Sequence, residues 1–362
     1  MDYCDLTDSF FYPSELAKLY SKLQTKEGFT FFQNQVKEKF IDKVIDRYQL
    51  TTSGTQKDFI DIPIGFNGVS EFSIKFGDAS DITGAIIIGN KGMGKSTLIS
   101  RIICEIGQKY NSNEVEIAIL DFKEGGGISN RFKDFPNVKF AGNGINDPLS
   151  CFEKYRNFIQ DSVNKKKKEM EKLENKNIDN LSSYLQYTGK NLPVILTIVD
   201  EGQDISNNSD LKVVKKEYFS LFNTILEKHR SFGHFLLFSA IHTRDISWES
   251  FVSQCDIRIG FRIGDRRNAS KIFEDKDDLF KLNKGQILIN SKLGIGNNTK
   301  VKIHKPINFE KKIDEIRKKY STKDLKQLKD DRTMIELESN TPKDKKNNFD
   351  VRDKTINLPG KI

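Results

Sequence analysis

The chain has 362 residues, of which 36% are hydrophobic and 30% charged, and a formal net charge of +8. This length accommodates one large α/β domain with additions, or two domains, and the positive charge is compatible with an anionic partner. The four cysteines and four histidines lack the spacing of a disulfide framework or a zinc site, and no stretch reaches the roughly 18 apolar residues of a membrane span.

The N-terminal ten residues are acidic and lack a secretory signal pattern, so we expect a cytoplasmic protein with no membrane span of its own. Residues 1–58 are predicted to form a helical module, because apolar residues recur at helical spacing from Leu16 to Ile45. Residues 59–83 are predicted to form two short strands around an Asn-Gly turn.

From Gly84 onward, continuous apolar strands alternate with helices, which predicts a mostly parallel sheet covered on both faces. Strands are expected at 115–122, 138–142, 194–201, 234–241, 257–263, 286–290 and 301–305. Helices are expected at 148–176 and 210–232. Beyond this main domain, assigned to residues 59–305, we expect a helical extension at 306–338. The polar residues 339–362 are predicted to be a disordered tail.

A glycine-rich loop follows the first of these strands, in the segment GAIIIGNKGMGKS (84–96). The segment matches G-x-x-x-x-G-K-[ST], in which backbone N–H groups surround phosphate oxygens at the start of a helix. The predicted nucleotide-binding residues are Gly89, Asn90, Lys91, Gly92, Met93, Gly94, Lys95, Ser96 and Thr97. Lys95 is expected to reach the β- and γ-phosphates, and the Ser96 hydroxyl to ligate Mg²⁺. The motif predicts ATP as ligand and an α/β P-loop NTPase fold of the RecA-like type.

A pair of acids ends the strand VILTIVDE (194–201). In P-loop enzymes one carboxylate holds Mg²⁺ and another orients the attacking water, both beside the phosphates. We therefore assign Asp200 to the metal and Glu201 to water activation. Adjacent acids can also cap a strand, but the upstream loop favours hydrolysis.

Further segments lie around these two motifs in a fixed order: IPIGFNG (62–68), LDFKEGG (120–126), EMEKLENKNIDNLSSY (169–184), VDEGQDI (199–205), RSFGHFLLFSAIHTRD (230–245), DIRIGFRIGDRRNASKIF (256–273) and LNKGQILIN (282–290). Their order and spacing resemble the FtsK/SpoIIIE/HerA group of pumping ATPases over roughly residues 60–305. The DFKEGG form is closer to the motor domains of type VII secretion ATPases than to those of chromosome pumps.

The resemblance implies catalytic roles for further residues. His242 stands where the family places a Gln that senses the γ-phosphate, although a strand-end His bonded to backbone is an equal alternative. Arg258 and Arg262 match the family's R-I-x-F-R block, from which an arginine would reach the γ-phosphate of a neighbouring subunit. Arg266 and Arg267 are alternatives for this role.

Two features of the DFKEGG region remain open. Asp121 and Lys123 keep the family's D-x-K pattern, which is consistent either with a role on the nucleotide side or with simple loop structure. The glycine-rich stretch Gly125 to Arg131, together with Lys133, is the candidate loop that grips a polymer in a pore, although a plain solvent loop is the commoner structure.

The resemblance as a whole implies an ATP-driven ring, expected to be a hexamer, that translocates double-stranded DNA. A secretion ATPase that moves polypeptide is one alternative, and a HerA-like DNA-processing or defence ATPase with a nuclease partner is another. In the second alternative, residues 1–58 would dock the nuclease, and a membrane protein is a further candidate partner. A scaffold that binds nucleotide without hydrolysis fits least, because both Asp200 and Glu201 are present.

Overall fold

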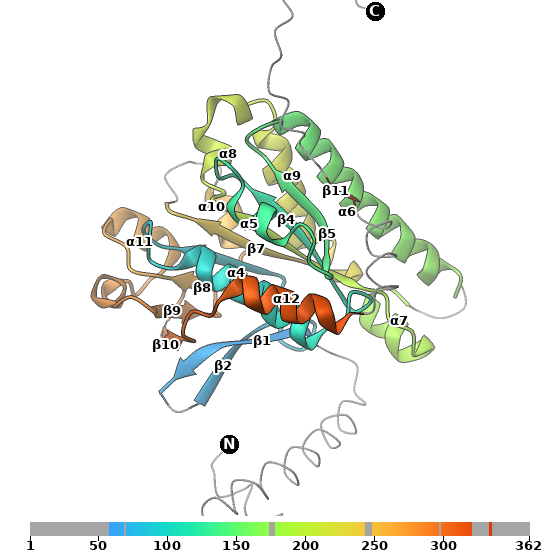
Figure 1. Ribbon diagram of the computed structural model, residues 1–362, viewed down its shortest axis with the longest axis horizontal. Helices are drawn as coiled ribbons and strands as arrows, with labels where there is room; N and C mark the ends of the chain where they lie inside the picture. Colours follow the sequence, from blue (N-terminus) through green and yellow to red (C-terminus); the bar gives the residue numbers. More distant parts are fainter. Residues whose placement is uncertain are drawn as a thin grey trace, which may run out of the picture.

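The computed structural model describes residues 58–68, 70–173, 178–242, 248–296, 298–320 and 333–334. These residues form one sheet of eleven strands, with helices packed on both of its faces (Figure 1). The strand order is β11-β5-β4-β6-β7-β3-β8-β9-β10-β1-β2. Within this described part of the chain, every helix is too short or too polar to span a bilayer.

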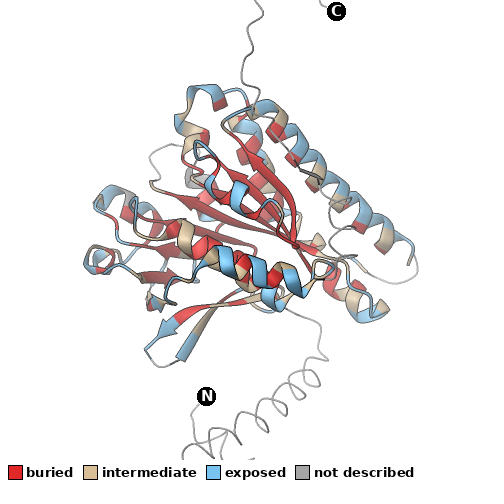
Figure 2. Ribbon diagram, viewed as in Figure 1, coloured by how far each residue is buried: buried red, intermediate tan, exposed pale blue. Residues whose placement is uncertain are grey.

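Parallel strands form one half of the sheet. In sheet order they are β5 (Val138–Asn143), β4 (Val115–Asp121), β6 (Val194–Asp200), β7 (His234–Ala240), β3 (Gly84–Ile88) and β8 (Ile257–Gly260), and β11 (Thr333–Met334) pairs with β5 at the edge. Strands β3, β5, β6 and β7 are buried along their whole length. Figure 2 shows this half as a continuous buried layer. Strands covered on both faces must be apolar throughout, which explains why they appear as unbroken hydrophobic runs in the sequence.

Antiparallel strands extend the sheet beyond β8. They are β9 (Gln286–Asn290), β10 (Thr299–Ile303), β1 (Asp58–Asn67) and β2 (Ser70–Gly77). Buried residues in β1 and β2 alternate with half-buried or exposed ones, because this part of the sheet is less completely covered. Gly65 permits the close approach of β1 to β10, since a Cβ there would lie 2.2 Å from the carbonyl oxygen of Lys302.

Two separate apolar cores cover the two faces of the sheet. One core includes Leu98 of α4 (Lys95–Lys109), Phe132 of α5 (Gly127–Phe132), Ile313 of α12 (Phe309–Lys319) and Leu181 of α7 (Leu181–Thr188). The other core includes residues from α6 (Pro148–Glu171), α9 (Lys215–Glu227), α10 (Trp248–Ser253) and α11 (Arg266–Ile272). In Figure 1, α12 accordingly lies in front of the sheet, next to α4.

The structure confirms the α/β fold with a mostly parallel sheet, and a strand lies at each of the seven predicted positions. The helix expected at 210–232 is shorter: a 3₁₀ turn (Ser209–Leu211) precedes α9, and another (Arg230–Phe232) follows it. The side chain of Asn208 accepts a hydrogen bond from Asp210 N, which favours a turn over helix there. At the other end, Gly233 adopts φ 65 and directs the chain into β7.

Several sequence predictions fall wholly or partly outside the described residues. The N-terminal helical module at residues 1–58 and the disordered tail at 339–362 belong to this group, apart from Asp58, which begins β1. The predicted helix at 148–176 is α6, which ends at Glu171, and residues 174–177 are not described. In the expected helical extension at 306–338, the described residues form α12 and the two-residue strand β11.

Candidate nucleotide-binding and catalytic site

The glycine-rich loop joins β3 to α4 with a backbone that only glycine adopts readily. Gly92 and Gly94 have φ values of 80 and 113, and Gly94 is the N-cap of α4. A Cβ at Gly89 would lie 2.5 Å from the Cβ of Phe261, so the loop packs closely on the segment after β8. No side chain caps the first amides of α4, which leaves the positive end of this helix available to an anion.

Lys95, the first residue of α4, points back into this loop. Its Nζ donates to the carbonyl oxygens of Gly89 and Asn90, at 2.7 and 3.2 Å. Burial lowers the pKa of the Lys95 ammonium, and the nearby carboxylates of Asp200 and Glu201 partly offset this effect. A cation held by two carbonyl oxygens inside a phosphate-binding loop is suited to exchange them for phosphate oxygens.

Asp200 closes the site from the carboxyl end of β6. Its Oδ2 accepts a hydrogen bond of 3.0 Å from the Ser96 hydroxyl, while its buried Oδ1 has no hydrogen-bond partner among the described residues. Burial raises the pKa of this carboxyl, Asp121 raises it further, and the nearby hydroxyls of Ser96 and Ser239 lower it. A buried carboxylate oxygen that accepts no hydrogen bond and a neighbouring hydroxyl oxygen are ligands that fit Mg²⁺.

Asp121 lies beside Asp200, because β4 and β6 pair in register at these two residues. Its carboxylate is fully buried and is engaged by the loop that follows: Oδ1 accepts from Lys123 N at 3.0 Å, and Oδ2 accepts from Ile128 N at 2.7 Å and Ser129 N at 3.0 Å. The geometry favours the structural alternative for Asp121, which organises the start of α5. Its charge still acts on the site by raising the pKa of Asp200.

Glu201 follows Asp200 in a left-handed backbone conformation, with φ 52, which is uncommon for a residue other than glycine. The next residue, Gly202, packs directly on Phe238 of β7, where a Cβ would lie 2.0 Å from the ring. The sharp turn directs the chain into the short helix α8 (Asp204–Asn207). Backbone strain of this kind at the end of a strand is common where a catalytic side chain is aimed at a site.

His242 lies at the same edge of the sheet. Strand β7 runs between β3 and β6, so its carboxyl end falls between the phosphate-binding loop and Asp200. His242 comes two residues after β7, half-buried, with its Nε2 3.4 Å from the Nδ2 of Asn207. The topology therefore places His242 at the edge of the sheet that also carries the phosphate-binding loop and Asp200. The two residues that follow, Thr243 and Arg244, lie outside the described part of the chain.

Arg258 is held inside its own subunit. Its Nη1 donates to the carbonyl oxygen of Ile272 at 2.7 Å and its Nη2 to that of Val252 at 3.3 Å. Burial lowers the pKa of this guanidinium. These contacts join β8 to α10 and α11, so the geometry of Arg258 is that of a structural residue and does not favour a reach into a neighbouring subunit.

The other three arginines have exposed side chains. The carbonyl oxygen of Arg262 accepts a hydrogen bond of 3.1 Å from Asn90 N, which places Arg262 directly beside the phosphate-binding loop. Arg266 lies over the Phe280 ring at 4.9 Å from its centroid and forms a 3.4 Å ion pair with Asp277. Arg267 follows it on α11. Exposed arginines at the carboxyl end of β8 remain the candidates for a role in a second subunit.

The candidate gripping loop lies between β4 and β5. Gly125 and Gly126 have φ values of 77 and 61, and the side chains of Lys123 and Lys133 are exposed. Arg131 is less available, because its Nη1 is 3.3 Å from the Ser100 hydroxyl of α4 and its guanidinium lies over the Phe309 ring. Lys133 belongs to the candidate gripping segment and Lys123 lies just before it, so exposed lysines flank its glycines on both sides.

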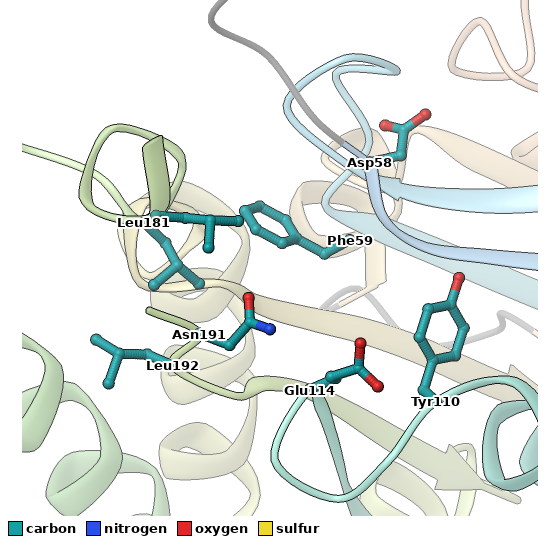
Figure 3. A pocket seen from close by; sticks show the side chains of 8 residues that line it. Asp58, Phe59, Tyr110, Glu114, Leu181, Asn191 and Leu192 are labelled. Atoms are coloured by element: carbon teal, nitrogen blue, oxygen red, sulfur yellow. The ribbon is translucent and has the colours of Figure 1, made fainter. Parts of the chain in front are cut away.

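A small cavity of about 140 Å³ lies elsewhere on the molecule (Figure 3). It is lined by Asp58, Phe59, Tyr110, Glu114, Leu181, Leu185, Asn191 and Leu192. Glu114 and Leu192 precede β4 and β6, so the cavity is at the amino ends of the parallel strands, whereas the phosphate-binding loop is at their carboxyl ends. It is also smaller than the roughly 300 Å³ of a small ligand pocket, so we do not assign the nucleotide to it.

Sequence reasoning missed two contributors to the site, Phe261 beneath the loop and Gln203 in the turn after Asp200. Gln203 is 4% exposed, and its Oε1 accepts a hydrogen bond of 3.0 Å from Ile241 N. Neither residue stands in a motif that states its role. The pairing of β3 with β8 places Phe261 against the glycine-rich loop. The pairing of β6 with β7 places Gln203 beside the backbone of Ile241.

Comparison with solved structures supports the fold. The cytoplasmic domain of the Thermomonospora curvata type VII secretion ATPase EccC is 17% identical, with a TM-score of 0.56, over 71% of this chain and 31% of that chain. EssC (ATPases 2 and 3) from Geobacillus thermodenitrificans is 17% identical, with a TM-score of 0.52, over 76% of this chain and 50% of that chain. This chain thus spans at most half the length of these two secretion ATPases.

The pCW3 conjugation coupling protein TcpA, in its monomer form with ATPγS, is 16% identical, with a TM-score of 0.55, over 73% of this chain and 72% of that chain. At such identities these likenesses concern the fold alone. No curated protein sequence matches the chain. Residues 46–276, more than half of the sequence, match the FtsK/SpoIIIE family, and the chain therefore belongs to this family of P-loop ATPases.

Proposed function

We propose that the chain is an ATP-hydrolysing motor whose subunits form a ring, expected to be a hexamer, and translocate double-stranded DNA. The observation that carries this proposal is the convergence of Lys95, Ser96 and Asp200 at the carboxyl ends of β3 and β6. Glu201 directly follows β6, and His242 lies two residues after β7, at the same edge of the sheet. Groups suited to bind phosphate, to hold a metal ion and to activate water thus lie at one edge of the sheet, which supports hydrolysis as the proposed reaction.

Each residue has a distinct task in this proposal. Backbone amides of the loop 89–94 and the first turn of α4 bind the phosphates, and Lys95 leaves its two carbonyl partners to bind the β- and γ-phosphates. Glu201 accepts a proton from the attacking water, which its turn positions beside the γ-phosphate. His242 donates a hydrogen bond to the γ-phosphate from the end of β7.

Ser96 and Asp200 would hold Mg²⁺, through the hydroxyl oxygen and the buried carboxylate oxygen that has no donor. When bound there, the cation would neutralise charge on the phosphate oxygens. A divalent cation there would favour the ionised carboxylate of Asp200, whose pKa burial raises.

The exposed arginines near the site support the proposed ring. Arg258 is engaged by carbonyl oxygens of its own subunit, whereas Arg262, Arg266 and Arg267 are exposed at the carboxyl end of β8. In a ring, one of these three arginines would reach the γ-phosphate of the neighbour and stabilise the charge that develops during transfer. Lys95 and this arginine would then act on the same nucleotide from two subunits.

Double-stranded DNA is the proposed substrate because the chain carries a formal net charge of +8 and exposes Lys123 and Lys133 near the site. Lysines can follow phosphates without reading the base sequence, as a translocating motor requires. A membrane protein or a nuclease would be a partner of the ring rather than part of its ATP site. A cytoplasmic location is part of the same proposal.

Steady-state ATP hydrolysis, measured with and without long duplex DNA and paired with the particle mass in ATP, tests this proposal. We expect duplex DNA to raise the rate of hydrolysis severalfold and the mass to be a multiple of the 41.6 kDa subunit. A rate that unfolded polypeptide raises and DNA does not would instead support a secretion ATPase. A monomer that hydrolyses no ATP with either polymer would contradict the motor proposal.

A further inference from the structure

The turn after β6 is tied to the end of β7 beyond the last pair of the sheet. Backbone pairing between these two strands ends at Val199 and Phe238. Two more hydrogen bonds continue the connection: Gly202 N donates to Ser239 O at 2.8 Å, and Ile241 N donates to the Oε1 of Gln203 at 3.0 Å. A glutamine side chain thus takes the place of a backbone acceptor.

The Gln203 side chain is an acceptor here: its Oε1 accepts the hydrogen bond from Ile241 N. The adjacent Asp204 has a pKa that burial raises and the nearby Gln203 side chain lowers. Gln203 is 4% exposed, so water is largely excluded as a substitute partner.

The two hydrogen bonds lie next to two proposed catalytic residues. Glu201 immediately precedes Gly202, and His242 immediately follows Ile241. The left-handed backbone of Glu201 and the contact between Gly202 and the Phe238 ring restrict how this turn can move. The position of His242 relative to Glu201 therefore depends on a short, rigid path that runs through the Gln203 side chain.

We propose that Gln203 is a positioning residue that sets His242 relative to Glu201, so that contact of His242 with a γ-phosphate aligns the water-activating carboxylate. The proposal rests on the function proposed above. It predicts an energetic coupling between Gln203 and His242 in turnover. A glutamine that only satisfied a buried N–H group would instead lower the stability of the fold without such coupling.

The test is a double-mutant cycle on the full chain with Gln203→Met, which keeps the length of the side chain and removes the hydrogen bond from Ile241 N, and His242→Ala. Turnover of ATP and affinity for a slowly hydrolysed ATP analogue are measured for each variant. We expect Gln203→Met to lower kcat about 10- to 100-fold and to change analogue affinity less than twofold, because the phosphate-binding loop is not involved. On a His242→Ala background, Gln203→Met should lower kcat less than threefold.

Gln286→Met is the matched control, because the Oε1 of Gln286 also accepts from a backbone N–H, that of Asn283 at 3.0 Å, at the start of β9 and away from the site. This variant should keep wild-type kcat. If Gln203→Met does not fold, Gln203→Asn serves in its place, since the same amide on a side chain one carbon shorter cannot accept from Ile241 N at the same place. Its loss of kcat should likewise disappear on the His242→Ala background.

Two outcomes would overturn different claims. Wild-type protein that hydrolyses ATP, with losses from the Gln203 and His242 variants that simply multiply, would overturn the positioning role and leave the proposed function intact. Wild-type protein that hydrolyses no ATP would overturn the proposed function itself.

Discussion

The two halves of the sheet are built differently and have different uses. The parallel half, from β5 to β8, is buried on both faces, and Asp200, Glu201 and His242 lie at or just after the carboxyl ends of its strands, at the edge where α4 begins with Lys95. In the antiparallel half, from β9 to β2, buried and exposed residues alternate along β1 and β2, and we assign no catalytic residue there. The comparison indicates that chemistry depends on the direction of the strands, because parallel strands bring their carboxyl ends to one edge.

The two halves of the sheet also differ in how their polar side chains are connected. Side chains at the carboxyl ends of the parallel strands bond to one another across the strands, as Ser96 does with Asp200, so a change at one strand end affects the others. Charged residues of β2 instead form exposed ion pairs, such as that of Lys75 with Asp61 at 3.8 Å, and exposed pairs of this kind contribute little. Matched substitutions in the two halves should therefore have very different effects on turnover.

The largest effect is expected from Glu201→Gln. The amide cannot accept a proton from water, so we expect ATP turnover to fall about 10³-fold while ATP still binds. Phosphate release and analogue binding measure the two effects separately. Glu71→Gln in β2 is the control, since Glu71 is half-exposed and pairs only with His304 among the described residues, at 3.5 Å. Normal phosphate release by Glu201→Gln would contradict the assignment of the base.

Lys95→Ala should have the next largest effect, on affinity rather than on turnover alone. Loss of a buried ammonium that would bind two phosphates should weaken ATP binding about 100-fold. Titration with a fluorescent ATP analogue measures this loss. Lys75→Ala, which removes an exposed lysine of β2, should bind as the wild type does. Wild-type affinity in Lys95→Ala would show that the phosphates bind elsewhere.

A smaller effect is expected from pH. The pKa of Asp200 is raised, so this carboxyl gains a proton at a higher pH than usual, and the pKa of Lys95 is lowered, so its ammonium loses its proton at a lower pH than usual. Both shifts narrow the pH range in which the free site carries the required charges. The pH profile of kcat/KM should therefore be bell-shaped, with a decline of up to about tenfold per pH unit on each side.

Asp121→Asn refines this expectation, because Asp121 is a cause of the raised pKa of Asp200. Removal of its negative charge should move the acid limb of the profile to lower pH and leave the alkaline limb in place. An acid limb that does not move, in a variant that still folds, would indicate that another group controls it.

The smallest effects are expected from a pair of glycine substitutions, one in each half of the sheet. A Cβ at Gly202 would lie 2.0 Å from the Phe238 ring, and a Cβ at Gly65 would lie 2.2 Å from the carbonyl oxygen of Lys302. Each alanine variant should lower the free energy of unfolding by about 1–3 kcal/mol, which thermal or urea unfolding can measure. Only Gly202→Ala should also slow turnover per folded molecule. Equal slowing by both variants would remove the functional distinction between the halves.

The fold was largely predictable from the sequence, because buried parallel strands appear as unbroken apolar runs such as VILTIVD and HFLLFSA. Lys95, Ser96, Asp200 and Glu201 were predictable because each stands at a fixed place in a motif. The local details were harder. The end of the helix before β7 depends on turns around Asn208 and Gly233 that helical spacing does not show.

Roles that depend on partners distant in sequence could not be predicted. The sequence alone does not distinguish the four arginines at 258, 262, 266 and 267. Only the structure shows that the guanidinium of Arg258 donates hydrogen bonds to the carbonyl oxygens of Ile272 and Val252. The role of Asp121 could not be decided from the sequence for the same reason, since its partners are the backbone N–H groups of Ile128 and Ser129, several residues later in the chain. Gln203 was missed because its acceptor role depends on the register of two strands.

The central claim is that ATP sites act together within a ring, and a mixing experiment tests it most directly. Wild-type subunits are combined with increasing fractions of Glu201→Gln subunits, which bind ATP without turnover, and hydrolysis is measured in the presence of duplex DNA. The account predicts that activity falls more steeply than the fraction of wild-type subunits. A strictly proportional decline would contradict it, because each subunit would then hydrolyse ATP on its own.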